Sequence, residues 1–227
     1  MRLPCLRECF PALVLFLLCS LLGCRENPGG GSAKSGVASV ENGASQNKHA
    51  DVSSDQLLKI ANDKLDADKY EEAIQLFTEL AERSPSATNH AFIGDCYWKQ
   101  RQLEQADIHY RQALEIDPKH CGANHALGRD AVLLQRYQEA IPYLDTASKV
   151  CAGTVLHAQN LRFRVEAFLE LNKITDAESD FEELMTLYPE NPHTYQAGIL
   201  VARKKGDEAL AAEYEAKLNA SSNGTPK

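Results

Sequence analysis

The sequence lacks the short motifs that mark common catalytic and metal sites. It contains no glycine-rich phosphate-binding loop, no His-Glu-x-x-His pair and no paired-cysteine zinc motif. His120, Cys121 and His125 lie close together in the sequence, but they are too few ligands for a closed metal site. We therefore expect a protein that is not an enzyme, binds no metal and needs no cofactor.

Basic residues are in short supply relative to acidic ones. The chain has 24 Lys and Arg side chains against 32 Asp and Glu, a formal net charge of −8 at pH 7. Nucleic-acid phosphates would meet a repulsive average field, so this balance predicts no nucleic-acid partner. An apolar content of 44% and a charged content of 25% are typical of a folded globular protein.

The apolar run near the N-terminus, residues 10–22, is shorter than the roughly 20 residues that a membrane-spanning helix needs. It follows a short basic stretch with Arg2 and Arg7 and precedes small residues, which is the pattern of a secretory signal. We expect residues 1–23 to be a signal peptide for export. The alternative is an uncleaved anchor helix.

The four residues Leu21-Leu22-Gly23-Cys24 resemble the lipobox of bacterial lipoproteins, in which the signal is cut before a lipid-bearing cysteine. The resemblance implies acyl chains on Cys24, and two or more such chains hold a protein stably on a membrane. Arg25 stands where an Asp would retain the lipoprotein at the inner membrane, so an outer-membrane location facing the periplasm is expected. The alternative is that Cys24 merely ends an apolar run that also contains other cysteines: Cys5, Cys9 and Cys19.

Residues 24–53 are rich in Gly, Ser, Ala and Asn and show no apolar periodicity, so we expect a flexible linker. Beyond it, four stretches are copies of one another: YEEAIQLFTELAERSP (70–85), LEQADIHYRQALEIDP (103–118), YQEAIPYLDTASKVCA (137–152) and ITDAESDFEELMTLYP (174–189). Each has a small residue followed four positions later by a large one on the same helical face. The small residues are Ala73, Ala106, Ala140 and Ala177, at spacings of 33, 34 and 37 residues.

A period near 34 residues with a helix-turn-helix unit resembles the tetratricopeptide repeat. Ile93, Gly94 and Tyr97 match the Leu-Gly-x-x-Tyr of that family. The resemblance implies an all-α solenoid, a right-handed superhelix of helix-turn-helix repeats. Its units would be residues 54–86, 87–120, 121–154 and 158–191, then a degenerate capping hairpin at 192–219 and a disordered tail at 220–227. The spacing of 37 predicts about three extra residues in the turn near Thr154 and a bend or wider gap there.

Proteins of this family usually bind their partners on a concave face lined by the first helix of each hairpin. By alignment, the candidate partner-binding residues are Asn62, Asp95, Trp98, Lys99, His125, Arg129, Arg162 and Glu166. The alternative is that Trp98 is a packing residue and the charges form a solvated face. The carboxylate clamp of chaperone-binding relatives is not expected, because Leu58 stands at its lysine position.

Repeat alignment places Cys121 at the start of the first helix of the third unit and Cys151 at the end of the second. Antiparallel helices bring those two ends together, and an exported protein meets an oxidising environment. A disulfide between them is therefore a hypothesis, whereas Cys96 is expected to be a small core residue.

These observations predict a membrane-anchored lipoprotein that acts as a protein–protein interaction scaffold or assembly factor in the bacterial cell envelope. Its partners would be a protein or peptide segment in the groove and the membrane itself, through the lipid on Cys24. The alternative is an accessory protein that binds a cell-wall glycan or serves an envelope enzyme or transport complex.

Overall fold

The structure is a computed structural model that describes His49 and residues 51–223. The predicted signal peptide, Cys24, most of the predicted linker and residues 224–227 lie outside the described residues. The described residues form ten helices and no strand. The helices are α1 (Ser54–Asp66), α2 (Tyr70–Arg83), α3 (Ala87–Lys99), α4 (Leu103–Ile116), α5 (Cys121–Leu133), α6 (Tyr137–Val150), α7 (Val155–Glu170), α8 (Ile174–Leu187), α9 (Pro192–Lys205) and α10 (Glu208–Asn223).

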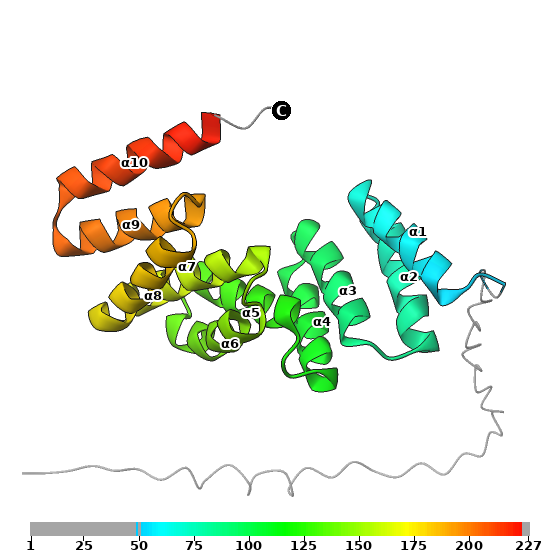
Figure 1. Cartoon of the computed structure of the whole chain (residues 1–227). Helices are drawn as coiled ribbons and strands as arrows, with labels where there is room; N and C mark the ends of the chain where they lie inside the picture. Colours follow the sequence, from blue (N-terminus) through cyan, green and yellow to red (C-terminus); the bar gives the residue numbers. More distant parts are fainter. Residues whose placement is uncertain (1–48, 50, 224–227) are drawn as a thin grey trace, which may run out of the picture. The chain divides into compact units, whose positions relative to one another are not determined.

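The helices pack as five antiparallel hairpins in chain order, each beside the next (Figure 1). The predicted all-α solenoid is therefore confirmed. The four alanines that define the repeat are fully buried, and each belongs to one of the hydrophobic clusters packed between the helices. None of the helices in the described part of the chain is both long and apolar enough to cross a membrane.

Two glycines in first helices make room for a large side chain of the second helix. A Cβ atom at position 94 would lie 2.6 Å from the Tyr110 ring, and one at position 128 would lie 2.6 Å from Leu144. The last hairpin repeats this arrangement, because a Cβ at position 198 would lie 2.7 Å from the Tyr214 ring. The hairpin predicted as degenerate thus keeps the close helix approach of the other units.

The turns inside the hairpins use a left-handed backbone residue. In the first four hairpins this residue is not glycine: Asp68, Arg101, Gln135 and Asn172 have φ between 57° and 64°. The fifth hairpin has Gly206 at φ 77°. These residues share the same turn position, so they give a structural alignment of all five hairpins.

The extra residues of the fourth repeat lie in a helix and not in a turn, contrary to the sequence prediction. Helix α7 has 16 residues where α5 has 13, and four residues separate α6 from α7 just as four separate α4 from α5. Thr154 caps the longer helix, its hydroxyl accepting a hydrogen bond from the Leu156 amide. Extending a capped helix adds a backbone hydrogen bond per residue, so the insertion forms nearly one further turn.

The predicted boundaries also change at both ends of the solenoid. The last hairpin continues to Asn223, so residues 220–223 are helical and not part of a disordered tail. At the other end, the last residues of the predicted linker are attached to α2. Arg83 donates hydrogen bonds of 2.7 Å to the carbonyl oxygens of His49 and Val52, and the His49 ring contacts Glu79 at 2.8 Å.

Candidate functional site

The first helices of the hairpins form the inner surface, which we define as the solvent-facing residues of α1, α3, α5, α7 and α9. Helix α7 contacts both α5 and α9, so the surface is continuous across these three helices. It is also the surface on which the candidate partner-binding residues were expected.

Trp98 is the centre of a cluster between α3 and α5. Its indole Nε1 donates a hydrogen bond of 3.1 Å to Asp130, and the Arg129 guanidinium lies 4.1 Å from the ring centroid. Arg129 also donates from Nε to the same Asp130 oxygen at 2.9 Å. A cation over an indole face and a shared carboxylate fix the orientation of the half-buried ring. The cluster is therefore preorganised before any partner binds.

Asp95 lies beside this cluster and accepts a hydrogen bond of 2.8 Å from the Tyr110 hydroxyl. Burial raises the pKa of the Asp95 carboxyl, while the Tyr110 hydrogen bond and the charges of Arg129 and Lys99 act in the opposite direction. Lys99 itself is exposed at the end of α3. The structure thus brings four candidates together, namely Asp95, Trp98, Lys99 and Arg129.

His125 is 7% exposed and contributes little area to the inner surface. Its Nδ1 lies 2.7 Å from the Oδ1 of Asn160, which is 0% exposed on α7, and burial lowers the pKa of the imidazole. His125 therefore connects two neighbouring hairpins beneath the surface. The role that sequence alignment suggested for it, direct contact with a partner, does not fit this burial.

Arg162 and Glu166, one helical turn apart, form a pair on α7, the first helix of the fourth hairpin. Arg162 donates a hydrogen bond of 2.9 Å to Glu166, and its guanidinium lies 3.7 Å from the centroid of the Phe163 ring. Together with Gln196, Ile199 and Leu200 of α9 they line an open recess of about 380 Å³. Asn62 is half-buried on α1, three hairpins away from this pair.

A recess of about 420 Å³ that sequence reasoning missed lies where α3, α4 and α5 meet. We call it the edge groove, since it lies at the turn end of the second and third hairpins. Its charged residues are Arg101, Glu104, Asp107, Asp130 and Arg136. Its apolar residues are Trp98, Leu103, Ile108, Leu133 and Leu134. The sequence signal that would have identified it is apolar side chains at repeat positions where the other hairpins are polar.

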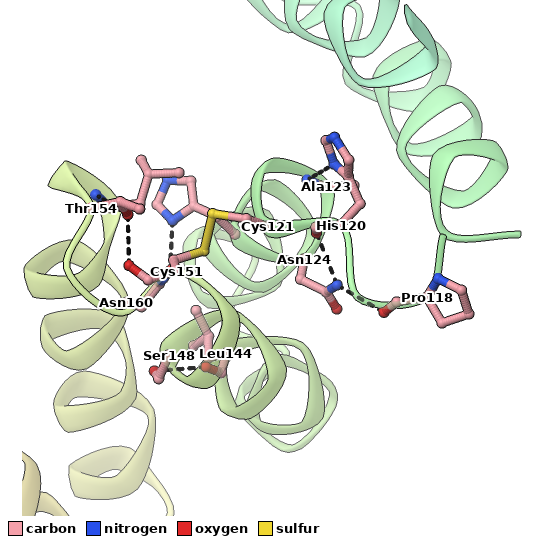
Figure 2. The surroundings of a disulfide bond; sticks show 12 residues. Pro118, His120, Cys121, Ala123, Asn124, Leu144, Ser148, Cys151, Thr154 and Asn160 are labelled. Atoms are coloured by element: carbon pink, nitrogen blue, oxygen red, sulfur yellow. Dashed lines mark hydrogen bonds between the residues drawn. A yellow bond between two sulfur atoms is a disulfide. The ribbon is translucent and has the colours of Figure 1, made fainter. Parts of the chain in front are cut away.

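The structure joins Cys121 and Cys151 in a disulfide, the pairing that repeat alignment suggested (Figure 2). Their Cα atoms are 5.4 Å apart, within the usual range for a disulfide. The bond connects the start of α5 to the residue that ends α6, so it lies within one hairpin. Cys96 is a free thiol in the core, and burial raises its pKa to about 12.

Comparison with known proteins gives a sequence match and a set of structural matches. The sequence model of the family described as "Tetratricopeptide repeat" matches residues 58–120 and 125–192. Tetratricopeptide repeat protein 21B of Mus musculus is 34% identical over 76 residues, which are 34% of this chain and 6% of that protein. The chain therefore spans only a small part of this curated relative's length.

Solved structures that share the fold of the chain include PilF and PilW. PilF of Pseudomonas aeruginosa is 20% identical with a TM-score of 0.63, and the match covers 77% of each chain. PilW, described as a widely conserved type IV pilus biogenesis factor, is 16% identical with a TM-score of 0.65, and the match covers 76% of this chain and 79% of that one. At these identities the similarity establishes the fold alone.

Proposed function

The chain belongs to the tetratricopeptide repeat family, and on that premise we propose that it is a scaffold that binds a protein or peptide segment on its inner surface. The observation that carries the proposal is the Trp98 cluster, in which Arg129 and Asp130 hold a half-buried indole in place. Trp and Arg are the residues most enriched among those that dominate binding energy at protein interfaces. Ordering them in advance lowers the entropy lost on binding.

The proposal includes no catalytic step. The two groups at or beneath the inner surface that are most suited to acid–base chemistry already have partners, because Asp95 accepts a hydrogen bond from Tyr110 and His125 contacts Asn160. Both groups support the surface on which the partner would bind. Presentation of a locally preorganised binding surface is thus the whole of the proposed mechanism.

We further propose that the protein acts as an assembly factor in the bacterial cell envelope, attached by lipid on Cys24 and facing the periplasm. The lipobox-like residues 21–24 support this location, and so does the Cys121–Cys151 disulfide, since such bonds persist in oxidising compartments. PilW, which has a similar fold, is described as a pilus biogenesis factor. The assembly role is proposed by analogy with that fold.

Site-specific photo-crosslinking in the native membrane tests the binding surface. A photoreactive residue is placed at Lys99 or, separately, at Glu115, which is exposed on the second helix α4. We expect a discrete adduct with a protein from position 99 and none from position 115. Equal labelling from both positions, or adducts with glycan alone, would refute the scaffold proposal.

Metabolic labelling with palmitate tests the anchor separately. The wild-type protein should incorporate label and fractionate with membranes, whereas Cys24→Ala should lose both properties. Equal labelling of the two would show that the lipid is not on Cys24. The crosslinking result would still stand in that case, because it depends on the folded repeats alone.

A further inference from the structure

The edge groove exposes an unusual amount of apolar surface. Leu133 is 62% exposed, Leu134 51%, Ile108 47% and Leu103 43%. All four line the same recess beside the Trp98 ring. Contiguous apolar surface of this kind marks a contact site more often than isolated exposed leucines do.

The other hairpins show that the fold does not require this apolar surface. Aligned on the left-handed turn residue, the counterparts of Leu133 are all charged: Asp66, Lys99, Glu170 and Lys204. The counterparts of Ile108 are polar or proline: Gln75, Pro142, Ser179 and Glu213. Leu103, by contrast, occupies a position that is apolar in most hairpins. The edge groove thus depends on Leu133 and Ile108, which only this junction carries.

The charges of the edge groove favour a cation in its occupant. Asp107 pairs with Arg111 at 2.7 Å, and Asp130 pairs with Arg129 at 2.9 Å. Arg136 pairs with Glu139 at 3.3 Å, and the Arg101 guanidinium lies 6.0 Å from the centroid of the Trp98 ring. Among the described residues, Glu104 is the groove carboxylate without an ion pair. The net charge of −8 on the chain also attracts a basic segment.

We propose that the edge groove binds a short segment of a partner protein that carries two large aliphatic side chains followed by a lysine or arginine. The aliphatic side chains fill the space between Ile108 and Leu133, against the Trp98 ring, and the cation pairs with Glu104. A recess of about 420 Å³ suits a few side chains and not a folded domain. This inference rests on the proposed binding of a protein partner but assigns it a second contact surface, which meets the inner surface at Trp98 and Asp130 and continues over the turns onto α4.

The chain offers a direct probe, because Trp98 is its only tryptophan and lines the groove. Short random peptides displayed on phage are selected on the full mature protein, and the enriched peptides are then synthesised and titrated while Trp98 emission is followed. We expect the enriched peptides to share two aliphatic residues and a nearby Lys or Arg, and to shift the emission of Trp98.

Substitutions that replace groove residues by their counterparts in the other hairpins test whether peptide binding depends on the groove. Leu133→Lys and Ile108→Gln introduce residues that the same fold already carries at Lys99 and Gln75. Each should weaken peptide binding at least about tenfold while leaving the unfolding midpoint unchanged. Glu104→Gln should remove the preference for a basic over an acidic peptide. Val155→Lys, at a side chain that is 87% exposed and does not line the groove, is the matched control and should bind as the wild type does.

The proposal fails if the enriched peptides are acidic, if they leave Trp98 emission unchanged, or if Leu133→Lys binds them as the wild type does. It also fails if Trp98 emission shifts with protein concentration alone, because a second copy of the chain would then be the occupant. If position 99 still crosslinks to its partner in the Leu133→Lys variant, the scaffold proposal stands. That result would show that the same partner does not need the edge groove.

Discussion

The Tyr110 ring occupies the space that a side chain at position 94 would need. A Cβ built on Gly94 would lie 2.6 Å from the Tyr110 Cε1 atom, and Tyr110 cannot turn away because its hydroxyl is hydrogen-bonded to Asp95. The glycine is thus required by packing between α3 and α4. The same contact holds Asp95 in place on the inner surface, so packing and binding geometry are coupled at this point.

Gly94→Ala should therefore lower the free energy of unfolding by about 1–3 kcal/mol, the usual loss when a close-packed core is overfilled. The matched control is Gly122→Ala in α5, where the nearest atom to the new Cβ, on the His120 ring, would be an ordinary 3.5 Å away. That variant should be as stable as the wild type or slightly more so. Urea unfolding measures both, and similar losses in the two variants would refute the packing argument.

Removing the Cys121–Cys151 disulfide should destabilise the solenoid. The two cysteines are 30 residues apart, and constraining a loop of that length in the unfolded chain is worth about 3–4 kcal/mol on a chain-entropy estimate. Urea unfolding of the wild type with and without reductant measures the loss. The Cys121→Ala/Cys151→Ala variant should not respond to reductant. Non-reducing peptide mapping that found both thiols free would contradict the bond.

Asp180 should make the stability depend on pH. It is buried on α8, where burial raises the pKa of its carboxyl to about 7, despite the Arg164 guanidinium 3.2 Å away. Because the folded-state pKa exceeds the unfolded value of about 4, the folded protein holds the proton more tightly. The contribution to stability is complete below about pH 4 and is lost as the pH rises through 7.

Asp180→Asn removes this titration, so the difference in unfolding free energy between wild type and variant should change between pH 5 and 8 by up to about 1.4 kcal/mol per pH unit. Every other titratable group is present in both proteins, so the difference cancels its contribution. A wild type that gained stability relative to the variant as the pH rose would show that the ion pair with Arg164 dominates over burial.

Asp130 should contribute more to the stability of the fold than Asp107, its neighbour in the edge groove. Asp130 accepts hydrogen bonds from both Trp98 and Arg129, so Asp130→Ala leaves two donors without a partner and should cost about 2 kcal/mol of stability. Asp107 pairs with Arg111 at the surface, and Asp107→Ala should cost less than about 1 kcal/mol. Thermal unfolding compares them, and equal losses would contradict the special role of the Trp98 cluster.

The sequence predicted the hairpins well because their packing is local. An alanine and a large residue four positions apart lie on one helical face wherever they occur, so Ala106 and Tyr110 identify their helix without further information. The extra residues before the fourth repeat could not be placed in this way. A spacing of 37 gives the length of the insertion, whereas its addition to α7 depends on the cap that Thr154 provides.

The candidate site was less predictable, because its residues interact across hairpins. Repeat alignment placed His125 on the inner surface but did not reveal that Asn160, 35 positions away, holds it beneath that surface. The edge groove was missed for a related reason. Its residues come from α3, α4 and α5, and Leu133 stands out only when the turn residue of each hairpin supplies the alignment.

The location of the disulfide within a single hairpin has a mechanical consequence. It stiffens the third repeat against pulling, whereas the junctions with the neighbouring repeats are held by packing and by hydrogen bonds such as Trp98–Asp130 and His125–Asn160. Small rotations at successive junctions add up along the array, so the solenoid should bend and stretch elastically even when fully oxidised. A partner that pulls on the protein would then deform the junctions between repeats before it deforms the disulfide-bonded third repeat.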